Sequence, residues 1–165
     1  AVIDLAPGGV GEHLLAGMRS AGPHRLEAAG KIGIPQVITP SGINLMSPRK
    51  SRYKPDYHQR KKFDLDKLRT FLRLNGEEIV MVADEFARKL NQAKGPVIVL
   101  LPLRGWSSID GPESPIYEPE TDLLFIEQLQ KQIDNDLVKI KTFDLNLEDE
   151  AFADQIVESL LNVLP

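Results

Sequence analysis

Short apolar runs alternate along this chain with segments whose apolar residues recur at helical spacing. The clearest apolar run covers 97–101 and lies between two prolines, a pattern typical of a strand buried on both faces of a parallel sheet. Further strands are predicted at 1–5, 35–39, 68–74 and 138–143. The pattern therefore predicts about five strands.

Helices are predicted between these strands. Their expected positions are 12–19, a segment from Pro23 to Gly30 or Gly33, 75–90, 119–134 and 152–164. Strands that alternate with helices favour right-handed parallel crossovers. We therefore expect a single α/β domain over 1–165, built as a three-layer sandwich around a Rossmann-like open sheet of about five mostly parallel strands.

The composition sets limits on function. With 165 residues, 42% hydrophobic and 27% charged, the chain is typical of one soluble globular domain. The absence of cysteine excludes disulfides and thiolate metal sites and fits a reducing compartment. No apolar run reaches the roughly 18 residues that a membrane span needs. We expect a cytoplasmic protein, and the abrupt start with a strand and a loop favours one half of a longer protein.

A basic loop at 48–63 is the one departure in composition. Its central part, 49–62, carries seven basic residues and one acid, and this local charge of +6 leaves −10 for the rest of a chain whose net charge is −4. Tyr53 and Tyr57 lie between the cations, a mixture used in contacts with nucleic acid. The acidic remainder argues against a broad nucleic-acid surface, and a solvated, mobile insertion is the simpler interpretation.

The loop that follows the central strand is the main candidate site. Open α/β sheets bind ligands just outside the carboxyl ends of their strands. This loop offers backbone N–H groups, two hydroxyl groups and a guanidinium, which suit a phosphate or a carboxylate. The candidate cofactor-binding residues in it are Arg104, Gly105, Trp106, Ser107, Ser108 and Asp110. Trp106 could stack on a base or fill the edge of the core.

Other predicted strands end in polar loops that parallel strands would bring to the same rim. Ser41, Gly42 and Asn44 follow one strand, and Arg73 lies near the carboxyl end of another, from which it could reach an anion. The turn at 7–9 is a further candidate, because its glycines allow close backbone approach. These residues complete the predicted ligand rim.

Three acids near the rim are candidate magnesium ligands. Asp110, Glu120 and Asp122 could hold Mg²⁺ beside a phosphate, since this ion prefers one or two carboxylates together with phosphate oxygens. Acids at a helix start also stabilise the helix dipole without any metal. The three histidines are isolated, and the chain contains neither a Walker loop nor a nucleophile elbow. No catalytic residue can therefore be named.

Three stretches resemble the tomato mosaic virus resistance protein-like family of ATP-binding domains, an uncharacterised protein family. They are 20–37, the sequence LLPLRGWSSID at 100–110, and PIYEPETD at 115–122. The resemblance implies ATP or nucleotide binding, dimers or larger assemblies, and a chain roughly twice this length with two α/β subdomains. This chain resembles the second, C-terminal subdomain. It departs from the family pattern at Asn44, where the family carries Asp, and around Asn146.

The leading hypothesis is a nucleotide-binding domain that uses ATP and Mg²⁺. The guanidinium groups of Arg104 and Arg73 would supply positive charge, and Ser107 and Ser108 would donate hydrogen bonds. Its expected partners are a nucleotide or another phosphorylated small molecule, the N-terminal half of the same protein, and further copies in a homo-oligomer. Two alternatives stay open: one half of a metabolite-processing enzyme with its site at the same rim, or a protein-interaction module with a vestigial ligand site.

Overall fold

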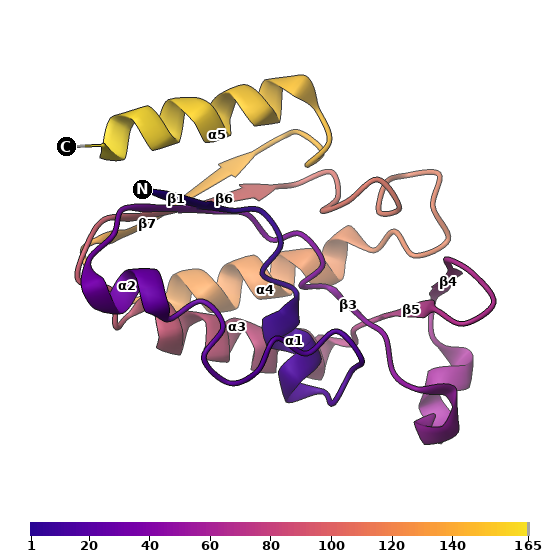
Figure 1. Ribbon diagram of the computed structural model, residues 1–165. Helices are drawn as coiled ribbons and strands as arrows, with labels where there is room; N and C mark the ends of the chain where they lie inside the picture. The colour runs from indigo at the N-terminus through magenta and orange to yellow at the C-terminus, as the bar shows by residue number, and fades with distance from the viewer. Residues whose placement is uncertain (165) are drawn as a thin grey trace.

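A four-stranded parallel sheet forms the centre of the computed structural model, which describes residues 1–164 (Figure 1). The strands lie across the sheet in the order β1 (Val2–Asp4), β2 (Gln36–Ile38), β6 (Val97–Pro102) and β7 (Val138–Phe143). Every neighbouring pair runs parallel. Because the spatial order follows the order along the chain, each crossover adds its strand at the same advancing edge of the sheet.

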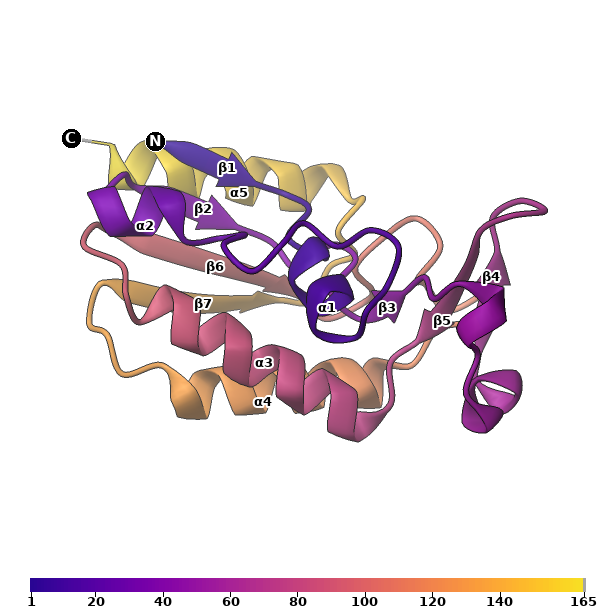
Figure 2. The same ribbon diagram turned by 60° about the horizontal axis from the view of Figure 1, so that its bottom comes forward.

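Helices cover both faces of this sheet. Figures 1 and 2 show α5 (Glu150–Val163) on one face and the other four on the opposite face. Those four are α1 (Gly9–Leu14), α2 (Ala28–Ile32), α3 (Gly76–Leu90) and α4 (Pro119–Gln132). None of the helices within residues 1–164 has the length and apolar composition needed to cross a membrane.

Alternate residues of β6 explain the three layers. Val99 and Leu101 belong to the larger core, together with side chains of α3 and α4, whereas Ile98 and Leu100 pack in a second core with Phe152 of α5. Successive side chains of a strand point to opposite faces, so an all-apolar strand requires cover on both. The predicted three-layer α/β sandwich with a Rossmann-like open sheet is confirmed.

Helix α3 follows directly from its local sequence. Asn75 accepts a hydrogen bond from the Glu78 backbone N–H at 2.9 Å, and the Asn75 N–H donates to the Glu78 carboxylate at 3.2 Å. The Asn-x-x-Glu spacing of this reciprocal capping box is visible in the sequence, and it begins the helix predicted at 75–90. Ile79, Val82 and Phe86 then bury one face. Since α3 and α4 each lead back to a parallel strand, both begin at the edge where those strands end (Figure 2).

The segment 68–74, expected as a strand of the parallel sheet, lies instead in a separate antiparallel sheet. This small sheet has the order β3 (Leu45–Met46), β5 (Thr70–Arg73) and β4 (Lys62–Asp64). Alternating polarity indicates a strand but does not select its partner, and here the partners are near in sequence. The small sheet lies within the connection from β2 to α3 and projects beyond the carboxyl edge of the parallel sheet (Figure 2).

The basic loop at 48–63 has defined secondary structure, whereas the sequence favoured a solvated, mobile insertion. It contains two short 3₁₀ helices, Lys50–Arg52 and Pro55–Gln59, and the side chain of Tyr57 belongs to the larger core. The Arg60 guanidinium lies over the Tyr57 ring at 4.7 Å and also pairs with Glu78 of α3. The loop is therefore anchored to the domain at its aromatic centre.

Candidate functional site

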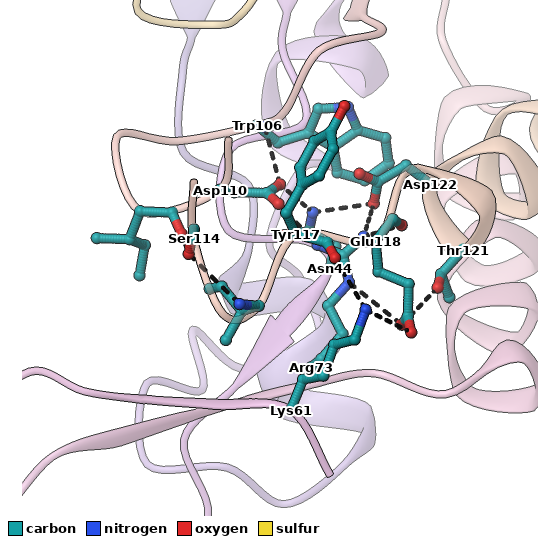
Figure 3. Close-up of polar contacts among 12 residues, drawn as sticks. Asn44, Lys61, Arg73, Trp106, Asp110, Ser114, Tyr117, Glu118, Thr121 and Asp122 are labelled. Atoms are coloured by element: carbon teal, nitrogen blue, oxygen red, sulfur yellow. Dashed lines mark hydrogen bonds and ion pairs between the residues drawn. The ribbon is translucent and has the colours of Figure 1, made fainter. Parts of the chain in front are cut away.

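A buried guanidinium, that of Arg73 at the end of β5, lies where several candidate residues meet (Figure 3). Its Nη1 donates to Asp110 Oδ1 at 3.0 Å, and its Nη2 donates to Asp122 Oδ1 and to the backbone carbonyl of Glu118. Asn44 Nδ2 bridges the same two carboxylates at 2.8 and 2.9 Å. We call Asn44, Arg73, Asp110 and Asp122 the Arg73 cluster.

The Arg73 cluster joins four segments that are distant in sequence. Asn44 comes from the loop between β2 and β3, Arg73 from β5, Asp110 from the loop after β6, and Asp122 from the first turn of α4. The side chain of Arg73 is 2% exposed and that of Asp110 is 0% exposed, so water solvates neither charged group. Buried ions require partners with good geometry. The sequence predicted that Arg73 could reach an anion, and the structure supplies that anion from within the chain.

One carboxyl group of the cluster titrates near neutral pH. Burial raises the pKa of Asp122 to about 7, and although the Arg73 guanidinium favours the charged form, the nearby Asp110 carboxylate opposes it. Two carboxylates beside one guanidinium leave one negative charge in excess. The net charge of the Arg73 cluster therefore changes as the pH passes through neutrality.

The loop 104–111 is held mainly by contacts within the protein. Arg104 forms an exposed bidentate pair with Asp144, and the backbone N–H of Ser108 donates to Glu148. Gly105 has a φ of +114°, and a Cβ there would lie 1.6 Å from the Asp110 carbonyl oxygen, so only glycine fits. The Ser107 hydroxyl is buried and has no hydrogen-bond partner within residues 1–164. These contacts give the loop a fixed shape.

Trp106 belongs to the core rather than to the ligand rim. Its side chain is fully buried, its Nε1–H donates to the Pro102 carbonyl at 2.8 Å, and its ring meets Phe125 edge to face at 5.3 Å. Its backbone N–H donates to Asp110 Oδ2 at 3.0 Å. The sequence left two roles open for Trp106, stacking on a base or filling the edge of the core. The structure shows the second of these.

The loops after β1 and β2 meet at a second part of the rim. A Cβ on Gly8 would lie 2.5 Å from the Gly42 carbonyl oxygen, so the two loops meet backbone to backbone. Gly42 has a φ of +73°, and a Cβ there would lie 3.9 Å from Arg19 Nη1. The backbone N–H groups of Ser41 and Gly42 have no acceptor in the part of the chain that the structure describes. Unfilled donors beside a guanidinium suit an anion.

Arg19 is a residue that the sequence did not single out. Its Nε and Nη2 contact Glu12 Oε1 at 2.8 and 2.7 Å, and its guanidinium lies over the Phe71 ring at 4.5 Å. Its Nη1 has no acceptor within residues 1–164. Glu12 is fully buried in α1, and a buried acid requires a cationic partner. The sequence contains no local signal of this burial, because Glu12 stands between Gly11 and His13.

The predicted magnesium ligands do not converge on an open position. Asp110 and Asp122 bind Arg73 and Asn44, while Glu120 lies at the exposed start of α4. Among residues 1–164, no group of three or more His, Cys, Asp or Glu side chains has a metal-binding arrangement. The magnesium site stays a prediction, and these carboxylates as arranged do not fit it.

A hollow of about 650 Å³ lies beside the Arg73 cluster, at the starts of α3 and α4. Lys61, Arg73, Glu118, Glu120 and Thr121 contribute to its wall. We call it the Lys61 hollow. A second hollow, of about 440 Å³, lies between Phe63 and the segment 108–115. The predicted site residues are thus divided between the Arg73 cluster, the loop 104–111, the rim at Gly42 and, for Glu120, the Lys61 hollow.

The parallel sheet, its one-sided crossovers and its polar carboxyl edge define a Rossmann-like α/β domain. Comparison with known families is more specific. The profile of the C-terminal domain of the uncharacterised protein family UPF0261 matches residues 1–164. The chain belongs to this family, as the sequence resemblance indicated.

Several relatives place the chain within longer proteins. A UPF0261 protein of Clostridium tetani is 30% identical over 154 residues, which are 93% of this chain and 38% of that protein. The ToMV resistance protein Tm-1(GCR237) of Solanum lycopersicum is 26% identical over 166 residues, covering 99% of this chain and 22% of the tomato protein. The chain therefore spans less than two-fifths of either relative.

Replacing Arg73 by Met should lower the free energy of unfolding by about 3–5 kcal/mol, because Asp110 and Asp122 would be left buried without a cation. Urea denaturation measures this. Arg69→Met is the matched control, since Arg69 pairs with Asp66 at the protein surface and should cost less than about 1 kcal/mol. Equal unfolding midpoints for the two variants would show that the cluster does not stabilise the fold.

Asp122→Asn should change how stability depends on pH. The folded state retains the Asp122 proton up to about pH 7, whereas the unfolded chain releases it near pH 4. As pH rises between these values, the wild type should lose unfolding free energy relative to the Asn variant, by up to about 1 kcal/mol per pH unit. Denaturant titrations across this range test it, with exposed Asp154→Asn as control. A difference independent of pH would contradict the expectation.

Proposed function

We propose that this chain is a nucleotide-binding domain whose phosphate site lies at the carboxyl edge of the parallel sheet. Its ligand would be ATP or another phosphorylated small molecule. The N-terminal half of the same protein would complete the site, in a cytoplasmic homo-oligomer. Magnesium would arrive with the nucleotide rather than on a preformed set of three acids.

The observation that carries the proposal is the rim at Gly42. Two glycine-containing loops meet there at the ends of adjacent parallel strands, and the N–H groups of Ser41 and Gly42 have no acceptor within residues 1–164. Arg19 presents its free Nη1 to the same place. Backbone donors and a guanidinium are the groups that proteins use for phosphate. In this proposal, Arg19 rather than Arg73 supplies the positive charge.

The position of the rim also supports a shared site. Strand β1 is an edge strand of the four-stranded sheet, so the loop after it lies at one end of the carboxyl edge. In open α/β sheets, ligands bind in the crevice at the point where the strand order reverses. Within residues 1–164 the strand order does not reverse. A second α/β half beside β1 would create such a crevice next to Gly8 and Gly42.

A protein-interaction module is the second candidate, and the basic loop favours it. Arg49, Lys50 and Arg52 are exposed and form no ion pair within the described residues. The Tyr57 anchor holds the segment that carries them in defined structure. Such a display of cations suits an acidic partner surface. No comparable observation favours the metabolite-processing enzyme.

The test is isothermal titration of ATP, with and without Mg²⁺, into the full-length protein carrying Arg19→Gln. Losing a charge-assisted hydrogen bond to phosphate should weaken ATP binding about tenfold or more. Arg69→Gln removes an exposed arginine of the small-sheet region and serves as the matched control. Unchanged affinity in the Arg19 variant would remove Arg19 from the site. A wild-type protein that binds no ATP would overturn the nucleotide proposal itself.

A further inference from the structure

The Lys61 hollow has the electrostatic character of an anion site. Helices α3 and α4, of 15 and 14 residues, both begin at it, and their first backbone N–H groups carry partial positive charge. The Lys61 ammonium and the Arg73 guanidinium lie on its wall, and Figure 3 shows both beside Glu118. An anionic group in this hollow would be favoured by two helix starts and by the Lys61 ammonium, and it could accept a hydrogen bond from the Arg73 guanidinium, whose charge is already compensated by Asp110 and Asp122.

One donor on the wall has no partner. The Arg73 side chain is 2% exposed, and although its two Nη groups bind the Arg73 cluster, its buried Nε–H has no hydrogen-bond acceptor within residues 1–164. A carboxylate oxygen of Glu118, Oε2, lies 3.9 Å from this Nε, which is too far for a hydrogen bond. Leaving a buried donor unpaired costs about 1–3 kcal/mol. The hollow thus contains an unfilled position for an acceptor atom.

The Glu118 carboxylate lies close to that position without filling it. Its Oε1 is 3.2 Å from Lys61 Nζ, and its Oε2 accepts from the Thr121 hydroxyl at 2.7 Å. The Glu118 side chain is 31% exposed, so it can move aside into water. It therefore resembles a loosely held internal substitute for an external carboxylate.

We propose that the Lys61 hollow binds a small organic carboxylate that displaces the Glu118 side chain. One carboxylate oxygen of the ligand accepts from Arg73 Nε, and the other pairs with Lys61. Leu74 and Leu124 form an apolar part of the same wall, so the ligand carries a short hydrocarbon body. The hollow of about 650 Å³ has the volume of a small-molecule site.

This site is separate from the proposed nucleotide site. None of its wall residues belongs to the rim formed by Gly8, Arg19, Ser41 and Gly42. The two proposals can therefore fail independently, since Arg19 contributes no side chain to the wall of the Lys61 hollow.

Hexanoate is a suitable probe, with hexanol as its uncharged counterpart and isothermal titration as the measurement. Glu118→Ala removes the internal competitor and should tighten hexanoate binding about tenfold relative to the wild type. Glu120→Ala is the matched control: it removes an acid from the same wall, two residues away, that forms no ion pair within the described residues. It should change affinity by less than about threefold, because screening weakens the effect of an exposed charge.

Two further variants keep the test decisive. Adding Lys61→Gln to Glu118→Ala should abolish the gain in hexanoate affinity. Glu118→Gln keeps the size of the side chain and loses its charge, so it should give a smaller gain and replaces Glu118→Ala if that variant does not fold. Three results would each overturn the proposal: no gain in either Glu118 variant, an equal gain in Glu120→Ala, or hexanol binding as tightly as hexanoate.

Discussion

The buried charge of Arg73 is the constraint on which the arrangement of this domain depends. Removing a guanidinium from water costs several kcal/mol unless anions compensate it. The two anions, Asp110 and Asp122, are 37 and 49 residues further along the chain. The small antiparallel sheet must therefore dock against the loop after β6 and the start of α4 before the charge is compensated. The ion pairs of this one guanidinium thus connect the small antiparallel sheet to the parallel sheet and to the helix layer.

This coupling determines which polar groups remain for a ligand. Asp110 and Asn44, which looked like ligand contacts from their places after predicted strands, are used inside the Arg73 cluster. Arg104 is paired with Asp144, and Trp106 fills the core. Most predicted side chains thus belong to the scaffold. Among residues 1–164, the groups left open include the backbone donors at Gly42, the Ser107 hydroxyl and two partly free guanidinium groups, those of Arg19 and Arg73.

The parts of the structure that depend on local pattern were predictable. The apolar run at 97–101 and the Asn75–Glu78 pair each determine their own element, and both are confirmed. Partners distant in sequence were not predictable: a segment such as 70–73 reads as a strand whether it joins a parallel or an antiparallel sheet. For the same reason the sequence indicated that Arg73 could bind an anion, but it did not identify Asp110 or Asp122 as that anion.

The position of Glu118 in the sequence suggests a role at the helix start, but its contacts in the structure indicate a different role. An acid at a helix start is normally explained by the helix dipole, and Glu118 does precede the first residue of α4. A capping side chain would also accept a hydrogen bond from the first backbone N–H groups, yet Glu118 makes no such bond. Its carboxylate contacts Lys61 and Thr121 instead. Partial burial alone would raise the pKa of Glu118, but hydrogen bonds from Thr121 and Lys61 and the nearby positive charges together hold that pKa below its usual range. The helix dipole alone would stabilise an acid anywhere in the first turn, whereas Lys61, Thr121 and the unfilled Arg73 Nε lie around one place. That convergence is the property of a carboxylate site, and a helix cap does not require it.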